Sequence, residues 1–306
     1  MAYFLAVDAG GTKAELLLAD EKRELARATC GTIKRLNATE EQAARNLEEA
    51  LAQLSVRTGV RLDQVARTCI GTSGNTVPLV TDWLRKNFAS RVSGELLVVG
   101  DVDIALDAVF PGDPGVLVLS GTGSNVAGRG ADRTIITAGG WGPMLADQGA
   151  GHWIGLEALR RGFLAIDEQR QTMLLEKARA LWGLPTIDSL IEFGNAEPRP
   201  HYADLVPLVV ECAETGDEIA GAILDQAGQE LAYLARLVIE RVRSREKGQL
   251  SLPAVAIAGS ILGKIDRVRD ALLDSLRARY LEIRFVLEPA DPVLGALYHA
   301  RGTLDQ

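Results

Sequence analysis

Two glycine-rich turns that lie about 110 residues apart constrain the fold of this chain more than any other feature. The first joins the apolar run Ala2–Asp8 to Lys13–Asp20, and the second joins Gly115–Leu119 to Asn125–Arg129. Glycine permits positive φ angles and leaves room for backbone N–H groups to approach an anion. Two turns of this kind predict a duplicated domain that grips one polyphosphate from both sides.

The sequence around these turns differs from the better-known phosphate-binding motifs. Neither GxxxxGK[ST] nor a GxGxxG after the first strand is present. Those motifs lead from a strand into a helix, whereas here a second β-like run follows each turn, so we predict two hairpins. Hydroxyl groups beside the glycines favour phosphate binding; they belong to Thr12, Ser120, Thr122 and Ser124. The alternative is a pair of ordinary glycine hairpins in a β-rich sheet.

The hydrophobic pattern along the rest of the chain predicts an α/β fold. Beyond the hairpins we expect strands over 24–29, 65–70, 96–99, 134–137 and 254–257. We expect helices over 39–54, 77–88, 102–109 and 293–301, one helix after residue 260, and several helices within 150–245. Pro111–Gly115 holds two prolines and two glycines and is the predicted domain boundary. We therefore expect domains at residues 1–113 and 114–306, with the last helix able to pack back on the first domain.

Charge and cysteine content narrow the classes of partner. The formal net charge of −8 argues against nucleic acid and against an anionic membrane surface as partners. No apolar run reaches transmembrane length, and residues 1–8 lead into a strand rather than a signal peptide. Cys30, Cys69 and Cys212 are isolated, without a CxxC pair, so we expect no disulfide, zinc or iron–sulfur site. We expect a cytoplasmic protein.

Several motifs together resemble one superfamily. Val7–Lys13, Leu119–Asn125 and Ile257–Ser260 resemble the phosphate-1, phosphate-2 and adenosine motifs of the actin, sugar-kinase and heat-shock-chaperone superfamily. Gly139–Gly142 with Leu145–Gly149 further resembles the N-acetylglucosamine kinase branch of the BadF/BadG-type ATPases. The resemblance implies two ribonuclease-H-like (actin-like ATPase) domains around a central nucleotide cleft. It also implies ATP and Mg²⁺ as cofactors, and transfer of the γ-phosphate to the 6-hydroxyl of an amino sugar. We also expect a homodimer.

Residues of the three nucleotide motifs are the expected contacts to ATP. These are Gly10, Gly11, Thr12, Lys13, Gly121, Thr122, Gly123, Ala258, Gly259 and Ser260. Asp8 ends the first apolar strand and faces the turn, where a carboxylate can hold Mg²⁺ through water. The alternative is that Asp8 only stabilises the turn.

Asp101 is the predicted catalytic base. It follows a strand and begins a helix, which is where α/β sheets place chemistry, and it can accept a proton from a sugar hydroxyl. Asp103 and Asp107 are nearby rivals, but Asp101 matches the aspartate position of the family. The alternative role for Asp101 is a helix N-cap.

The acceptor-sugar contacts are expected from the resemblance. They are Asn37, Asp101, Gly140, Trp141, Gly142 and Asp147. Loop 72–75 matches the family more loosely, and Gln148 replaces the glutamate usual in the family. The alternative role for Trp141 is packing in the hydrophobic core. The alternative role for Asp147 is to cap the helix that begins near Gly149. We expect His152 to be a surface or core residue rather than a ligand.

The leading function from the sequence is therefore an ATP-dependent hexosamine kinase. Two other classes stay open: the ATPase activator of a 2-hydroxyacyl-CoA dehydratase or benzoyl-CoA reductase, and a catalytically silent sugar-binding sensor. The sequence leaves the acceptor open between N-acetylglucosamine, glucosamine and N-acetylmuramic acid.

Overall fold

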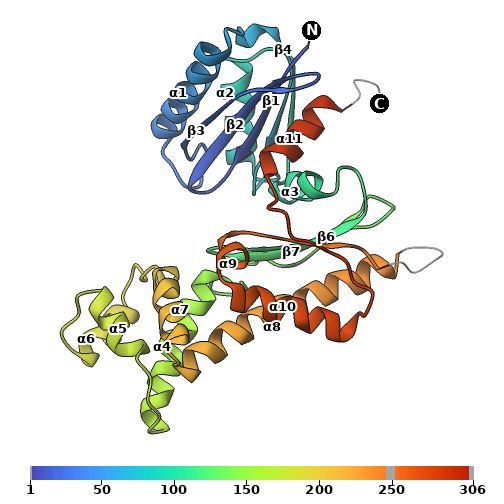
Figure 1. The fold of residues 1–306 in the computed structure, drawn as a ribbon. Coiled ribbons are helices and arrows are strands. Elements are labelled where there is room, and N and C mark those ends of the chain that lie inside the picture. The colour runs from blue at the N-terminus through green and yellow to red at the C-terminus, as the bar shows by residue number, and fades with distance from the viewer. Residues whose placement is uncertain (1, 246–251, 303–306) are drawn as a thin grey trace. The chain divides into compact units, whose positions relative to one another are not determined.

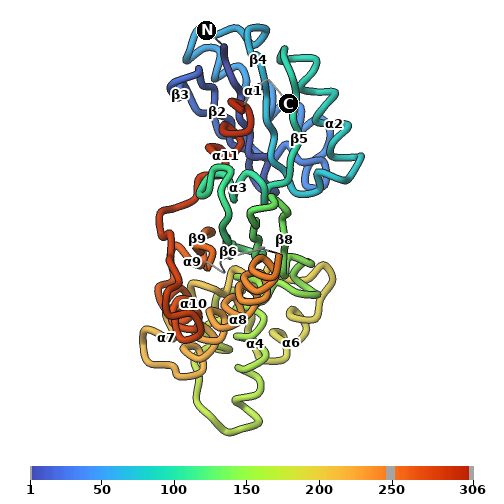
Figure 2. The backbone as a smooth tube through the Cα atoms, turned by 90° about the vertical axis from the view of Figure 1, so that its right-hand side faces the viewer, coloured from blue at the N-terminus to red at the C-terminus, as the bar shows by residue number. Residues whose placement is uncertain are grey.

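The computed structural model describes residues 2–245 and 252–302, and it divides into two compact units. The first unit comprises Met1–Asp113 together with Ala290–Gln306, and the second comprises Pro114–Pro289. Figures 1 and 2 show the chain coloured from its N-terminus to its C-terminus. The expected second domain included residues 290–306, with the last helix able to pack back on the first domain; the structure groups this segment with the first unit.

The first unit is built on a five-stranded sheet in the order β3-β2-β1-β4-β5. Its strands are β1 (Tyr3–Ala9), β2 (Lys13–Asp20), β3 (Glu24–Gly31), β4 (Val65–Gly71) and β5 (Glu95–Val99). Its helices are α1 (Glu40–Thr58), α2 (Pro78–Ala89), α3 (Asp101–Val109) and α11 (Pro292–Arg301), with a 3₁₀ turn η1 (Leu62–Gln64). Strands β1, β2 and β3 pair antiparallel, and β4 and β5 continue the sheet in parallel.

Alternate residues of β1 enter two separate hydrophobic cores. Leu5 and Val7 pack with the buried faces of α1 and α2, while Phe4 and Ala6 pack with α3 and α11. The two layers of helices on opposite faces of the sheet explain why β1 is apolar at consecutive positions.

Helix α11 belongs to the first unit because its apolar face covers the sheet there. Val293, Ala296, Leu297 and Ala300 are buried in the same core as Phe4 and Ile104. A Cβ at Gly295 would overlap the carbonyl oxygen of Ile104, so glycine lets α11 approach α3 closely. Figure 1 shows α11 beside the strands of this unit, and Figure 2 shows it next to α3.

The second unit repeats the sheet of the first, in the order β10-β9-β6-β7-β8. Its strands are β6 (Gly115–Ser120), β7 (Ser124–Arg129), β8 (Ile135–Gly139), β9 (Val255–Ala258) and β10 (Phe285–Val286). Again three strands pair antiparallel and two continue in parallel. The duplicated α/β architecture predicted from the two turns is therefore confirmed. The two-residue strand β10 was not predicted.

Helices make up the rest of the second unit. They are α4 (Gly151–Asp167), α5 (Leu174–Leu181), α6 (Ile187–Gly194), η2 (Tyr202–Leu205), α7 (Val206–Glu214), α8 (Glu218–Arg243), α9 (Ser260–Lys264) and α10 (Asp266–Arg279). Buried residues of α4, α7, α8 and α10 form one core with the sheet. Within the described residues, none of the helices combines the length and apolarity that a membrane span requires.

Candidate functional site

The first glycine turn is a hairpin between β1 and β2, as predicted, with Ala9 opposite Ala14. Thr32 Oγ1 donates a hydrogen bond to the carbonyl oxygen of Gly10 at 2.8 Å. A Cβ at Gly10 would stand only 2.8 Å from the carbonyl oxygen of Lys13, so this position requires glycine. Gly11, Thr12 and Lys13 are exposed, which leaves their backbone and side chains accessible to a ligand.

Asp8 sits in an electrostatic environment that penalises its charged form. Burial, followed by the negative charges of Asp101 and Glu15, raises the pKa of Asp8 to about 6, while Lys13 opposes the shift. A divalent cation would relieve this penalty by pairing with the carboxylate. Among the described residues, no group of three or more His, Cys, Asp or Glu side chains is arranged to hold a metal ion.

Asp101 is the first residue of α3 and is half-buried. The N-cap of the helix is Gly100, so the alternative that Asp101 caps α3 is wrong. Its Oδ1 accepts a hydrogen bond from the N–H of Val102 at 2.9 Å. Asp8 of β1 pairs with Gly71 of β4, and Gly71 pairs with Val99 of β5, two residues before Asp101. Both carboxylates therefore lie at the same edge of the sheet, and the charge of Asp101 contributes to the raised pKa of Asp8.

The rival carboxylates on α3 have other surroundings. Asp107 is buried and accepts a hydrogen bond from the N–H of Gly112 at 2.8 Å, and its Oδ2 lies 2.9 Å from Nε2 of His299. Asp107 therefore links α3 to the segment that follows it, through Gly112, and to α11, through His299. Burial raises the pKa of Asp103, although His299 opposes this shift.

The predicted acceptor loops of the first unit reach this same edge. The side-chain amide of Asn37 lies 3.8 Å from the position of a Cβ on Gly11. Thr72 donates from its N–H to the carbonyl oxygen of Val99 and from its hydroxyl to that of Ala9. Asn37 and loop 72–75 are thus positioned beside the ends of β1, β4 and β5.

The second glycine turn is also a hairpin, between β6 and β7. The first two N–H groups of α4 bind its carbonyl oxygens: Gly151 to Gly121 at 2.8 Å and His152 to Thr122 at 3.1 Å. The hydroxyls of Ser120 and Ser124 donate hydrogen bonds to the carbonyl oxygens of Gly149 and Gln148, which lie just before α4. The turn is therefore fixed on the N-terminus of α4, and Thr122 itself stays exposed.

A pocket of about 480 Å³ brings the second turn and the predicted adenosine motif together. Gly121, Thr122 and Ser260 line it within the second unit. A Cβ at Gly259 would overlap the carbonyl oxygen of Ser120, and Gly259 has a φ of 96°, so this position requires glycine. The remaining walls come from η2, α7 and α9, and they are mostly apolar: Ala203, Val206, Pro207, Val210, Ile261 and Ile265.

Comparison with known proteins agrees with this arrangement. A profile of the BadF/BadG/BcrA/BcrD ATPase family matches residues 5–300. The chain belongs to the BadF/BadG/BcrA/BcrD ATPase family.

Two curated proteins with similar sequences are kinases by name. An N-acetylmuramic acid/N-acetylglucosamine kinase from Clostridium acetobutylicum is 25% identical over 313 residues, which span 100% of both chains. An N-acetyl-D-glucosamine kinase from Dictyostelium discoideum is 27% identical over 314 residues, or 96% of each chain. A solved structure of a candidate N-acetylglucosamine kinase from Chromobacterium violaceum has a TM-score of 0.74 at 24% identity, covering 97% of this chain and 98% of the other.

In this member of the BadF/BadG/BcrA/BcrD family, the loop between β8 and α4 is closed by Asp147. That carboxylate is 8% exposed and accepts a hydrogen bond from the N–H of Gly142 at 3.2 Å. Burial raises its pKa, and the Gly142 bond opposes the shift. The N-cap of α4 is Ala150, so the alternative that Asp147 caps the helix is wrong. Trp141 is 73% exposed, which excludes the alternative of core packing.

Sequence reasoning missed several residues at these loops. Asn125 lies against Gly140. Its Oδ1, like Oε1 of Gln148, is buried and has no hydrogen-bond donor among the described residues. A ligand that brings N–H or O–H groups would satisfy these oxygens. A polar residue within an otherwise apolar strand was the available signal for Asn125. His201, Asp204 and Lys264 line the pocket at the adenosine motif and had no motif to reveal them.

His152, which we expected to be a surface or core residue, is buried. It is 9% exposed and packs edge-on against Tyr202, with ring centroids 5.1 Å apart. Burial, with the positive charges of His201 and Arg199, lowers its pKa. A neutral imidazole with no hydrogen-bond partner at Nε2 fits the core role.

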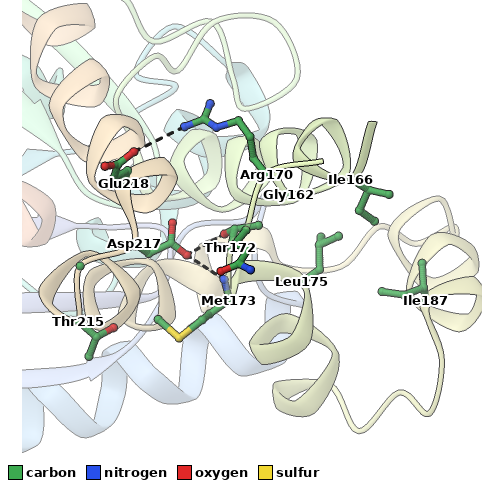
Figure 3. Close-up of a pocket in the computed structure, with 12 residues that line it drawn as sticks. Gly162, Ile166, Arg170, Thr172, Met173, Leu175, Ile187, Thr215, Asp217 and Glu218 are labelled. Atoms are coloured by element: carbon green, nitrogen blue, oxygen red, sulfur yellow. Dashed lines mark hydrogen bonds and ion pairs between the residues drawn. The ribbon is translucent and has the colours of Figure 1, made fainter. Parts of the chain in front are cut away.

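A larger pocket, of about 800 Å³, lies among the helices of the second unit and contains none of the predicted site residues. Figure 3 shows Asp217 among the residues that line it, with dashed lines to Thr172 and Met173. The Asp217 carboxylate accepts hydrogen bonds from Thr172, Met173, Ile219 and Ala220. Asp217 is thus the N-cap of α8 and a tether for the segment before α5, which is a structural role.

Proposed function

We propose that this chain is an ATP-dependent kinase that transfers the γ-phosphate to the 6-hydroxyl of N-acetylglucosamine or a close amino sugar. The observation that carries the proposal is the pocket formed by Thr122, Ser260 and apolar residues of α7 and α9, whose composition suits a nucleoside beside a phosphate-binding turn. The names of the two curated relatives support an amino sugar as the acceptor. The proposal includes a cytoplasmic homodimer.

The nucleotide contacts follow from the two turns. Backbone N–H groups at residues 10–13 and 121–123 would bind the phosphates, and Ala258, Gly259 and Ser260 would contact the adenosine. Asp8 would hold Mg²⁺, and this ion would neutralise the negative charge that develops on the phosphates.

Proton transfer is assigned to Asp101. As the 6-oxygen of the sugar bonds to the γ-phosphorus and ADP departs, the carboxylate of Asp101 accepts the hydroxyl proton. Asn37, Gly140, Trp141, Gly142 and Asp147 are the proposed groups that orient the sugar. Exposed Trp141 can cover a sugar ring with its indole face.

The cysteines disfavour the role of a dehydratase or reductase activator, which needs thiolates to hold an iron–sulfur cluster. Cys69 and Cys212 are buried, and Cys30 is half-buried. Burial raises the pKa of Cys30 to about 11 and that of Cys69 to about 12, so both remain thiols. The presence of both Asp8 and Asp101 disfavours a silent sensor.

The test is ADP release by the purified protein with Mg-ATP and a panel of sugars. We expect turnover with N-acetylglucosamine or glucosamine to exceed that with glucose by about tenfold or more in kcat/KM, because a lost polar contact leaves a buried group unpaired. Sugar-independent ATP hydrolysis by a coloured, iron-containing protein would instead identify an activator. Sugar binding without ADP release would identify a sensor.

Substitution of Asp147 tests the sugar loop separately. We expect Asp147→Ala to raise the KM for the amino sugar about tenfold, with the KM for ATP nearly unchanged, because the loop that carries Gly142 loses its anchor. Asp147→Asn is the matched control, since it can still accept the Gly142 bond. Early melting with a parallel loss of both affinities in Asp147→Ala would contradict the sugar assignment.

A further inference from the structure

A pocket between α4 and α6 lies within the second unit and is separate from both pockets described above. Its volume is about 500 Å³, within the range of small-molecule sites, which is about 300–1,000 Å³. We call it the α4–α6 pocket, and its floor is apolar: Leu156, Leu159, Phe163, Leu190 and Ile191. Leu159 and Leu190 belong to the hydrophobic core, whereas Ile191 is 44% exposed. An apolar ligand would therefore cover surface that water now contacts.

The rim of the α4–α6 pocket is basic. Arg160 and Arg199 line it, and none of the described lining residues is acidic. Both arginines are exposed and form ion pairs with residues outside the lining, Arg160 with Glu157 at 3.1 Å and Arg199 with Glu197 at 3.2 Å. Exposed ion pairs add little to stability, so the guanidinium groups can exchange them for a ligand. Because a guanidinium binds a carboxylate through two parallel hydrogen bonds, charge complementarity favours an apolar ligand that carries a carboxylate.

Arg199 also spends an N–H group on a weak acceptor. Its Nη1 donates to the thioether sulfur of Met144 at 3.0 Å, and a thioether is a weaker acceptor than a carboxylate oxygen. Met144 belongs to the loop between β8 and α4, two residues after Gly142, whose N–H binds Asp147. A carboxylate that accepts this hydrogen bond from Arg199 would release Met144, and with it one of the contacts that hold the loop.

Another wall of the α4–α6 pocket is fixed. Tyr202 is 4% exposed, its hydroxyl donates to the carbonyl oxygen of Gly194 at 2.6 Å, and its ring packs edge-on against His152. Met144, in contrast, is 53% exposed. A ligand that enters the pocket would therefore displace Met144 rather than Tyr202.

We propose that the α4–α6 pocket is an effector site for a small carboxylic acid with an aromatic or branched aliphatic body, and that its occupation weakens binding of the acceptor sugar. The body would cover the apolar floor, and the carboxylate would bind Arg199 in place of Met144. The site itself is independent of the proposed kinase function, and only its effect on the sugar rests on that function. His201 and Ala203, which flank Tyr202 in the chain, line the pocket at the adenosine motif. Because the Tyr202 wall stays in place, we expect the affinity for ATP to be unchanged.

Ligand-observed NMR titration of the purified protein with 3-phenylpropanoate and 4-methylpentanoate tests the site directly. We expect both acids to bind, and 3-phenylpropan-1-ol, which keeps the aromatic body without the charge, to bind about tenfold more weakly than 3-phenylpropanoate. Arg199→Gln should lower the affinity for the acids by a similar factor and leave that for the alcohol unchanged. Arg170→Gln is the matched control and should change neither, because Arg170 is also an exposed arginine paired with the glutamate two residues before it.

Gly194 allows the pocket to be filled without a collision with backbone. Apart from its neighbours along the helix, a Cβ at Gly194 would meet only the side chain of Leu159, at 4.0 Å. Leucine also has a higher helix propensity than glycine. We expect Gly194→Leu to abolish binding of the acids and Gly194→Ala, the matched control, to retain it. A saturating acid should raise the KM for the amino sugar about fivefold in the wild type and in Gly194→Ala, with the KM for ATP unchanged, and should have no effect in Gly194→Leu.

Other outcomes overturn the inference. Absence of binding by both acids at millimolar concentration would refute the site, as would binding that persists in Gly194→Leu. Equal affinities for 3-phenylpropanoate and the alcohol would refute recognition of a carboxylate, and binding without a change in the KM for the sugar would refute the effect on the sugar. If no sugar stimulates ADP release, the proposed function fails while the titrations still decide the site. Direct binding of the amino sugar with and without acid then replaces the KM, and equal or absent sugar binding refutes the effector role.

Discussion

Asp101→Asn lowers kcat for the amino sugar by roughly 10²–10⁴-fold, while the affinity for Mg-ATP stays close to that of the wild type. The substitution keeps the size of the side chain and an oxygen that can accept the hydrogen bond from Val102. It removes the group that accepts the hydroxyl proton. Steady-state ADP release, together with nucleotide titration in the absence of sugar, separates the two quantities.

Asp103→Asn is the matched control for this prediction. Asp103 is two residues further along the same helix and is also partly buried, with a raised pKa caused first by burial. We expect its substitution to change kcat much less than that of Asp101. If the large loss follows Asp103 instead, the base is Asp103, and Asp101 only shapes the field around Asp8.

Asp8→Asn stabilises the ligand-free protein above pH 6 and at the same time lowers Mg-dependent turnover by roughly 10²-fold. The folded protein raises the pKa of Asp8 from 3.8 to about 6, so its charged form costs folding free energy. That cost is absent below pH 3.8, grows between pH 3.8 and 6, and is fully present above pH 6. At 1.36 kcal/mol for each pKa unit, the gain from Asn is at most about 3 kcal/mol.

Denaturant unfolding at pH 5 and pH 8 without Mg²⁺ checks the sign of this effect. Asp20→Asn is the control of opposite sign, because hydrogen bonds from the N–H groups of Lys22 and Arg23 lower the pKa of Asp20. Its charged form stabilises the fold, so its substitution should destabilise the protein at both pH values. If Asp8→Asn destabilises the protein as Asp20→Asn does, Asp8 is a turn stabiliser and not the metal ligand.

The fold was largely predictable because its signals are local. Alternating or continuous apolar runs identified every strand except β10, whose two residues are too few to produce a pattern. Pairing of Phe285 and Val286 with β9 comes from tertiary packing and not from their own sequence. Likewise, the residues of α11 show helical periodicity, but their apolar face does not reveal which unit it covers.

The candidate site was predictable where glycine leaves a sequence signature and where an aspartate stands at the end of an apolar strand, as Asp8 and Asp101 do. Gly10 and Gly259 stand where a Cβ would collide with backbone, and these constraints produced the motifs. The walls of the adjacent pocket, such as Val206 and Val210, resemble any apolar helix face.

The return of α11 to the first unit has a consequence for biosynthesis. Strand β1 leaves the ribosome early, but the face that carries Phe4 and Ala6 lacks the part of its cover that α11 supplies until α11 has been made. The whole of the second unit is translated in between, which at about 5–20 residues per second delays the cover by roughly ten seconds or more. The second unit is continuous and can fold while translation proceeds. The nascent first unit, in contrast, leaves the part of its sheet that α11 covers exposed throughout that interval.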